Sequence, residues 1–219
     1  MIIEFFGLPG SGKTVNMKAL LDHFGSDARQ VLPERGVLKN GGLRLVFSAE
    51  FLTFLRLIVG LWLRKKRKVR YDLRTLYHFS LLYLACMKRR GDESVRYYLL
   101  DHGLVQSVSS LVWDEPGLYA KSSAVLRHFE RYFAGSLRFV FTDYADSGEL
   151  VRRIKTRAYD VRLKHFADEE AISVLQAQRQ FFAQAAEELK KGFCLTQIDS
   201  AEPPAANTER LLRELDNQG

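Results

Sequence analysis

The residues with the clearest chemical potential lie near the start of the chain, in the stretch GLPGSGKT at positions 7–14. This stretch fits G-x-x-x-x-G-K-[ST], the phosphate-binding P-loop or Walker A pattern. Glycines let the backbone turn tightly, so that successive N–H groups point inward and bind an anion. Lys13 supplies a full positive charge for the terminal phosphates, and the hydroxyl of Thr14 suits Mg²⁺. The stretch therefore predicts a nucleotide site.

The sequence on either side of this loop fits the same interpretation. Ile2 to Phe6 is an apolar run suited to a buried parallel strand, and apolar residues recur at helical spacing from Val15 to Phe24. A helix that begins near Lys13 directs its positive dipole end at the phosphates. A glycine-rich turn that binds nothing is the weaker alternative. The residues expected to contact the nucleotide are Gly7, Pro9, Gly10, Ser11, Gly12, Lys13 and Thr14.

Apolar runs and helical patterns alternate through the rest of the chain. This alternation predicts a three-layer α/β/α P-loop NTPase fold with a mainly parallel five-stranded sheet. The expected strands are 2–6, 29–32, 96–103, 136–144 and 193–199. The later helices are expected at 44–63, 71–89, 104–112, 118–133, 147–157, 167–192 and 207–215. The helical region at about 43–93 is an insertion in one domain of 219 residues.

Two acidic residues follow expected strands, where parallel sheets bind their ligands. Asp101 ends the apolar run YYLL, and a carboxylate there binds Mg²⁺ or orients an attacking hydroxyl. Its alternative role is to cap the helix that starts after Gly103. Glu34 follows the second strand, where it is either a general base for an acceptor hydroxyl or an ordinary loop residue.

Two arginines, Arg153 and Arg157, lie four residues apart in ELVRRIKTR, on one face of the expected helix. From a lid over residues 153–166 they would neutralise charge on a phosphoryl group during transfer. The alternative is a solvated basic helix face, which is the usual role of such a run.

The charge and apolar pattern of the middle third allows several partners. The formal net charge of +7 suits phosphorylated ligands, nucleic acid or an anionic membrane. Residues 51–63 are densely apolar and precede RKKRKVR at 64–70, but the run is too short to span a bilayer. A buried helix with a solvated basic end is favoured over an interfacial helix at 51–70 on anionic lipid. Nucleic acid ranks last, because no recognition module accompanies the basic run.

The cysteines and the start of the chain bear on the cellular compartment. Cys86 and Cys194 lie far apart in apolar stretches, which favours buried free thiols in a reducing cytosol. No basic leader precedes the first apolar run, so a secretory signal is not expected. We therefore expect a cytoplasmic protein, with peripheral attachment to a membrane as the alternative.

The order of these features resembles that of P-loop nucleoside and nucleotide kinases, in particular the thymidylate kinase-like group. GLPGSGKT is similar to the phosphate loop, LPERG to the segment after strand two, and LLDHG to the Asp-Arg motif. RRIKTR is similar to the arginines that lead into the ATP lid. The resemblance implies that Glu34 is a catalytic base. It also implies that the loop from Asp199 to Ala201 contacts adenine.

Two departures from this family pattern concern the acceptor. His102 stands where the family has an arginine that grips the acceptor phosphate, and Gly103 replaces a bulky residue. The segment 36–93 is also longer and more apolar than a typical acceptor-binding region. The acceptor is therefore expected to be a nucleotide other than thymidylate, a nucleoside, a sugar or an amphipathic alcohol.

The sequence supports an ATP-dependent phosphotransferase as its main functional hypothesis. Lys13, Arg153 and Arg157 would contact the phosphates, Thr14 and Asp101 would bind Mg²⁺, and Glu34 or Asp101 would activate the acceptor. The alternative is a nucleotide-dependent switch or accessory ATPase that acts at a membrane surface or on a protein partner. A GTPase is not favoured, because the chain has no Asn-Lys-x-Asp segment for guanine.

Overall fold

The computed structural model describes residues 1–32, 42–66, 68, 70–92, 94–113, 115–157 and 162–216. Glu34, the expected base after the second strand, lies outside these residues, and its role stays a prediction.

The described residues form a five-stranded sheet in the order β2-β3-β1-β4-β5, and every neighbouring pair is parallel. Its strands are β1 (Ile2–Gly7), β2 (Ala28–Gln30), β3 (Tyr97–Leu100), β4 (Leu137–Asp143) and β5 (Leu195–Asp199). All residues of the central strand β1 are buried, as expected for a parallel strand covered on both faces. The predicted fold class is confirmed. Because β1 is central, the loop that follows it lies in the middle of the carboxyl edge.

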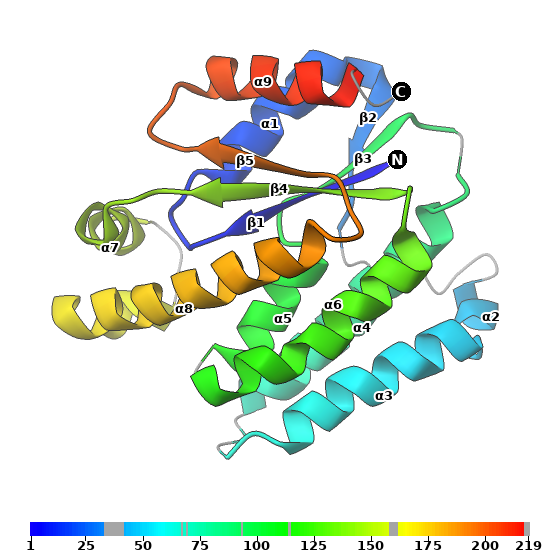
Figure 1. Ribbon diagram of the computed structural model, residues 1–219, viewed down its shortest axis with the longest axis horizontal. Helices are drawn as coiled ribbons and strands as arrows, with labels where there is room; N and C mark the ends of the chain where they lie inside the picture. The colour runs from blue at the N-terminus through cyan, green and yellow to red at the C-terminus, as the bar shows by residue number, and fades with distance from the viewer. Residues whose placement is uncertain are drawn as a thin grey trace.

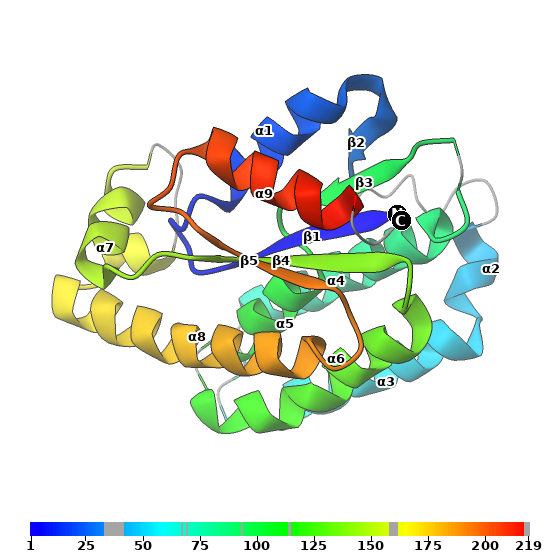
Figure 2. The same cartoon turned by 45° about the horizontal axis from the view of Figure 1, so that its top comes forward.

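Helices cover both faces of the sheet (Figures 1 and 2). On one face lie α1 (Lys13–Phe24) and α9 (Pro204–Asp216), and on the other α5 (Leu104–Val112), α6 (Tyr119–Phe133) and α8 (Asp168–Leu189). Helix α7 (Ser147–Lys155) lies beyond the carboxyl ends of the strands (Figure 1). Single helical turns occur at Gly25–Asp27, Pro116–Leu118 and Arg162–His165.

The segment expected to be a helical insertion contains α2 (Gly42–Val46), α3 (Ala49–Leu63) and α4 (Arg70–Arg89). Its status as an insertion stays a prediction. Helix α4 packs on α5, and α3 packs on α4 and α6 at the outer side of the molecule (Figure 1). A buried ion pair of 3.0 Å between Lys65 and Asp72 joins the end of α3 to the start of α4. The basic run after α3 is therefore only partly solvated, because Lys65 is buried.

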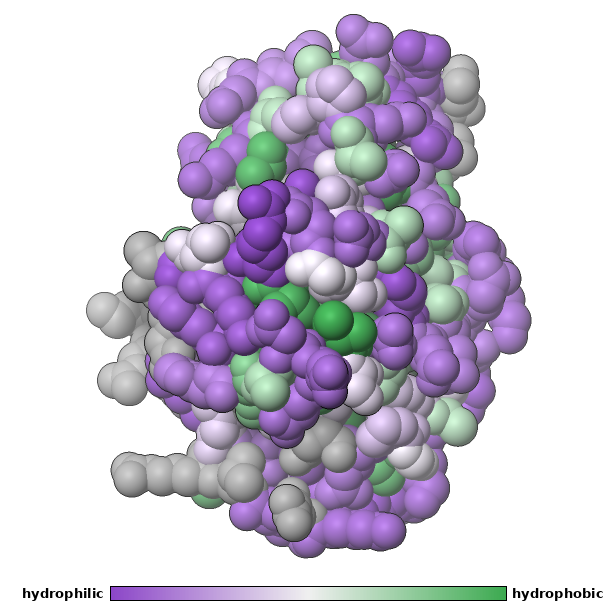
Figure 3. Space-filling model, turned by 90° about the vertical axis from the view of Figure 1, so that its left-hand side faces the viewer, coloured by the Kyte–Doolittle hydropathy of each residue, from purple (hydrophilic) through white to green (hydrophobic). Residues whose placement is uncertain are grey.

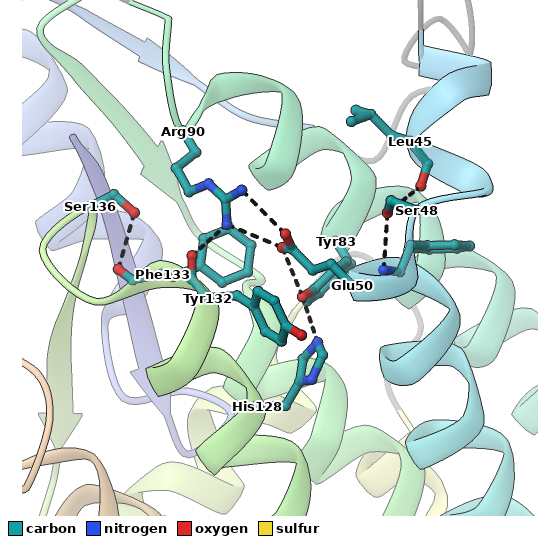
Figure 4. Close-up of polar contacts among 10 residues, drawn as sticks. Leu45, Ser48, Glu50, Tyr83, Arg90, His128, Tyr132, Phe133 and Ser136 are labelled. Carbon is teal, nitrogen blue, oxygen red and sulfur yellow. Dashed lines mark hydrogen bonds and ion pairs between the residues drawn. The ribbon is translucent and has the colours of Figure 1, made fainter.

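The prediction of one helix over 44–63 is wrong, because the chain breaks between α2 and α3. Ser48 adopts an extended backbone conformation, and its hydroxyl accepts a hydrogen bond of 3.1 Å from the N–H of Phe51 (Figure 4). Serine is a preferred residue at this position because it satisfies a helix N–H that has no partner within the helix. Helix α9 starts at Pro204, ahead of the expected 207, since proline fits the first helical turn.

A buried polar network joins α3, α4 and α6 (Figure 4). The Tyr83 hydroxyl donates to Glu50 at 3.2 Å and lies 2.6 Å from Nε2 of His128. Arg90 donates two hydrogen bonds of 3.2 Å to the same carboxylate. All these contacts are satisfied together when His128 is neutral and donates to the Tyr83 oxygen. The network therefore links the three helices through hydrogen bonds and one ion pair, and it holds the imidazole of His128 in a buried position.

This network makes stability depend on pH. Burial, together with Arg131, lowers the pKa of His128 to about 4, against about 6.5 in an unfolded chain. Between these values the unfolded chain binds more protons, so the free energy of unfolding falls as the pH falls. We expect His128 to contribute a loss of about 2 kcal/mol between about pH 7 and pH 4. Urea unfolding of wild type and His128→Gln at several pH values measures this contribution. A constant difference between the two proteins would contradict it.

Two further observations concern the membrane and the thiols. Among the described residues, none of the helices combines the length and the hydropathy that crossing a bilayer requires. Cys86 is buried and Cys194 is half-buried, and both are free thiols.

Candidate functional site

The loop between β1 and α1 lies against β4. Gly7 has a φ of 144°, and a Cβ at this position would overlap the backbone oxygen of Thr142. Only glycine fits here, because it tolerates this φ and carries no side chain. Gly12, with a φ of 80°, immediately precedes α1. The loop therefore directs its backbone toward the carboxyl edge of the sheet, at the start of a helix.

Lys13 is buried within this loop, with only 7% of its surface exposed. Its ammonium donates to the carbonyl oxygens of Gly7 at 3.0 Å and Leu8 at 2.7 Å. The pKa of Lys13 is lowered to about 8, mainly by burial; Asp101 opposes this shift, and Arg157 adds a smaller lowering. A desolvated cation in this position gains strongly from a bound anion, since its attraction to the anion is weakly screened.

Thr14 and Asp101 meet at the edge of the site. The Thr14 hydroxyl donates to the two carboxylate oxygens of Asp101 at 2.8 and 3.0 Å. A hydroxyl and one carboxylate fit Mg²⁺, which usually binds one or two carboxylates, phosphate oxygens and water. No cluster of three or more His, Cys, Asp or Glu side chains arranged for a metal occurs in the described part of the chain. A magnesium site of this kind does not require one.

The N-terminus of α5 is capped by Glu4, not by Asp101. The carboxylate of Glu4 accepts hydrogen bonds from the N–H groups of Leu104 at 2.8 Å and Val105 at 2.7 Å. Burial raises the pKa of Glu4 to about 8, while these donors lower it. The alternative role of Asp101 as a helix cap is therefore wrong.

The same carboxylate explains the glycine at position 103. A Cβ on Gly103 would overlap the Glu4 side chain and lie 2.5 Å from its Oε1. Glu4 was not among the expected site residues. The available signal was a single acidic residue in the otherwise apolar strand IIEFF.

A cavity of about 1130 Å³ begins at the loop and extends between α5 and α8. Lys13, Thr14 and Asp101 line one end. This end opens on the side of the molecule toward which the strands of Figure 1 point. Figure 3 shows that side, where apolar side chains gather among hydrophilic ones near the middle. The cavity is large enough for a nucleotide together with a small second ligand.

Both expected lid arginines line this cavity. Helix α7 ends at Lys155, so Arg157 lies beyond it and not on a shared helix face with Arg153. Arg153 stacks 4.2 Å above the ring of Tyr144 and donates to Glu149 at 2.9 Å. Arg153 is therefore held in place by protein contacts before any phosphate binds.

The far end of the cavity contains residues that the motifs did not indicate. They are Ser109 and Ser110 on α5, Trp113 just after α5, Phe166, and Gln178 on α8. Gln106 on α5 also lines the cavity but lies beside the phosphate loop, because its Oε1 accepts a hydrogen bond of 3.4 Å from the N–H of Gly7. The α5 residues follow helical spacing, so a polar and aromatic stripe was the available signal. Gln178 is 8% exposed, and its Oε1 has no hydrogen-bond partner within the described part of the chain. A buried amide oxygen without a partner is costly, which indicates a place for a ligand donor.

His102 lines the cavity beside Asp101. The cavity walls lower its pKa by desolvation, and Lys13 and Arg157 lower it further against the opposing effect of Asp101. The positive charge of His102 is therefore disfavoured in this cavity, so this residue is a poor replacement for the charge of an arginine.

The loop after β5 contacts the phosphate loop without entering this cavity. The hydroxyl of Ser200 donates to the backbone oxygen of Ser11. Asp199 instead lines a separate hollow of about 350 Å³ with Asp143 and Tyr144, and Ala201 is exposed. The expected adenine contacts of Asp199 and Ala201 stay a prediction.

Comparisons with known proteins show similarity of structure only. No protein-family model matches the chain, and no curated protein matches it. A deoxyadenosine kinase from M. mycoides, solved with the products dCMP and dCDP, is similar with a TM-score of 0.56 and 13% identity over 99% of this chain and 100% of that one. The same kinase with bound dATP is similar with a TM-score of 0.56 and 12% identity, again over 99% of this chain and 100% of that one.

A second solved protein is also similar. YorR from Bacillus subtilis, in complex with phosphorylated GDP, gives a TM-score of 0.50 and 13% identity over 100% of this chain and 99% of that one. At such identities the likeness establishes a shared fold. It supports a P-loop kinase-like architecture, and the narrower thymidylate kinase-like grouping stays a prediction.

Proposed function

We propose that the protein is an ATP-dependent, Mg²⁺-dependent phosphotransferase that moves the γ-phosphoryl group to a hydroxyl of a small acceptor. The observation that carries this proposal is the single cavity that joins Lys13 to Gln178. It offers a phosphate site and a second binding site in one continuous, partly open space. A nucleotide-dependent switch needs no such second site, so the switch is the less favoured function. The reaction is expected in the cytoplasm.

The phosphate end of the cavity is suited to hold and polarise a triphosphate. Lys13 would contact the terminal phosphates, and Thr14 with Asp101 would hold Mg²⁺, which neutralises phosphate charge. Arg157, beyond the end of α7, would bind the phosphoryl group as charge shifts toward the leaving oxygen. Transfer of this kind is catalysed mainly by position and charge, and these residues provide both.

The far end of the cavity is suited to a flat, hydrogen-bonding acceptor. Gln178 offers an amide whose oxygen has no partner among the described residues, and Trp113 and Phe166 offer aromatic surface, with ring centroids 6.2 Å apart. A nucleoside or nucleotide has this chemistry, which agrees with the deoxynucleotides bound to the M. mycoides kinase. We therefore rank a nucleoside or nucleotide above a sugar or other alcohol. Either Asp101 or Glu34 would accept the hydroxyl proton.

Transfer of label from γ-labelled ATP to pooled nucleosides, nucleotides, sugars and lipid alcohols tests the proposal. We expect label on one class of acceptor and a loss of about a hundredfold in Asp101→Asn, because Mg²⁺ would lose the carboxylate that Asp101 provides. ATP binding, followed by fluorescence, should fall much less. Asp22→Asn, on the exposed side of α1, is the matched control. ATP hydrolysis without transfer to any pool would overturn the kinase proposal and favour the switch.

A further inference from the structure

The outer side of α3 is apolar and open to solvent. Leu52, Arg56, Val59 and Leu63 recur at helical spacing and form one stripe along this side. Leu52 is 50% exposed and Leu63 is 58% exposed, and Phe47, just before the helix, is 76% exposed. The opposite side of α3 already fills the core with Phe51, Phe54, Ile58 and Leu61. A solvent-facing stripe of this composition on a core helix marks an interaction surface.

Positive charge lies within the stripe and at its carboxyl end. Arg56 lies within it, and Arg64, Lys66 and Lys68 are exposed at its carboxyl end. Among the described acids near this turn, Glu50 is bonded to Arg90 and Asp72 is buried against Lys65, while the carboxylate of Glu115 accepts a hydrogen bond of 2.6 Å from the backbone N–H of Lys66. Four exposed cations against the one carboxylate of Glu115 leave the surface positive. The ammonium of Lys68 lies 5.8 Å from the ring of Trp62, so part of this basic turn is held against the helix.

We propose that this surface docks on an anionic phospholipid membrane. Helix α3 would lie in the plane of the interface, with Leu52, Val59 and Leu63 at the boundary between headgroups and acyl chains. Lys66 and Lys68 would contact the anionic headgroups, and the long side chain of Arg56 would reach them from within the stripe. The attachment is peripheral and does not depend on the proposed kinase activity.

Charge distinguishes this occupant from a second copy of the chain. In a two-fold contact across the stripe, Arg56 at the middle of α3 would face Arg56 of the other copy, and in a parallel arrangement the cations at the carboxyl end would also meet. Such like-charge contacts are unfavourable. An anionic surface pairs with all of these cations at once. Nucleic acid would pair with the cations but leaves the apolar stripe without a partner. An anionic bilayer satisfies both parts of the surface.

The docking surface is continuous along the chain with the cavity. Tyr71, three residues after Lys68, is 48% exposed and also lines the cavity. A docked α3 would therefore hold this side of the cavity near the lipid surface.

Co-sedimentation with vesicles tests the surface directly. The full chain is mixed with phosphatidylcholine vesicles that contain about one third phosphatidylserine, and with phosphatidylcholine vesicles alone. We expect binding to the anionic vesicles, weakened about tenfold or more by Leu52→Glu with Leu63→Glu, and about tenfold by Lys66→Glu with Lys68→Glu. Only the variant Lys66→Glu with Lys68→Glu should lose most of the salt dependence of vesicle binding. All four side chains are exposed, so folding is expected to survive.

The matched control reverses the same number of positive charges on the face of the sheet that lies opposite α3. Lys18→Glu with Arg213→Glu alters α1 and α9 at exposed positions. It should bind anionic vesicles like the wild type. Equal loss in this control would show attraction by net charge alone, and absence of binding to either vesicle would also overturn the proposal. A wild-type dimer in sedimentation that Leu52→Glu with Leu63→Glu converts to monomer would assign the surface to a second copy.

Discussion

Lys13→Met is expected to reduce phosphoryl transfer about a thousandfold without reducing the stability of the nucleotide-free protein. The loss of activity follows from removing the only lysine ammonium that the structure places inside the phosphate loop. Contacts of this kind stabilise charge in the transition state and are worth several kcal/mol. The side chain of methionine is close in length, so the loop keeps its packing.

The second half of this expectation rests on the buried charge. Lys13 has a pKa of about 8 in the folded chain, below its ordinary value of 10.5, because burial disfavours its charged form. At neutral pH the folded chain therefore loses about 3 kcal/mol relative to a lysine whose pKa is unchanged. Methionine removes this cost. The carbonyls of Gly7 and Leu8 then lose their hydrogen-bond donor, and this loss cancels about 1–3 kcal/mol of the gain in stability.

Two assays on the same preparations separate the effects. Label transfer measures activity, and urea unfolding without nucleotide measures the free energy of unfolding. Lys18→Met, on the exposed side of α1, is the matched control and should change neither. Normal transfer by Lys13→Met would remove the phosphate role of this residue. A large loss of stability would show instead that the ammonium is a structural contact.

Gly103→Ala is expected to destabilise the fold by about 3 kcal/mol or more, which is large for one added methyl group. The new Cβ would overlap the Glu4 side chain. Glu4 cannot move aside, because it is fully buried in the central strand and holds two N–H groups of α5. If the Glu4 carboxylate or the start of α5 moves, Asp101 should move as well, because it lies two residues before Gly103. Transfer should therefore fall together with stability.

A double-mutant cycle identifies the cause. Glu4→Ala alone should cost about 2–3 kcal/mol, because it leaves buried N–H groups without an acceptor. The combination Glu4→Ala with Gly103→Ala should cost clearly less than the sum, since the first change removes the overlap. Gly60→Ala is the control, because its Cβ would meet no atom within 4 Å, and it should be neutral or slightly stabilising. Additive effects would mean that Glu4 is not the obstacle. Urea unfolding gives all the values.

Much of the fold could be predicted because its signals are local. The phosphate loop is eight consecutive residues, and the apolar runs around it have the lengths and spacing of buried strands and helices. The structure confirms the predicted five-stranded sheet and places Thr14 against Asp101. The break before α3 was also local, because Ser48 is a preferred cap, but an apolar pattern that continues across it concealed the signal.

The sequence by itself determined that a P-loop pattern follows an apolar strand, and it predicted that this loop and Asp101 lie at the same edge of a parallel sheet. Only the tertiary structure decided which distant residues share that edge. Glu4 explains Gly103 across almost a hundred positions, and Gln178 enters the cavity of Lys13 from α8. Such contacts depend on how helices pack on the sheet, and side-chain direction is set by that packing. The spacing of residues along the sequence does not reveal how the helices pack on the sheet.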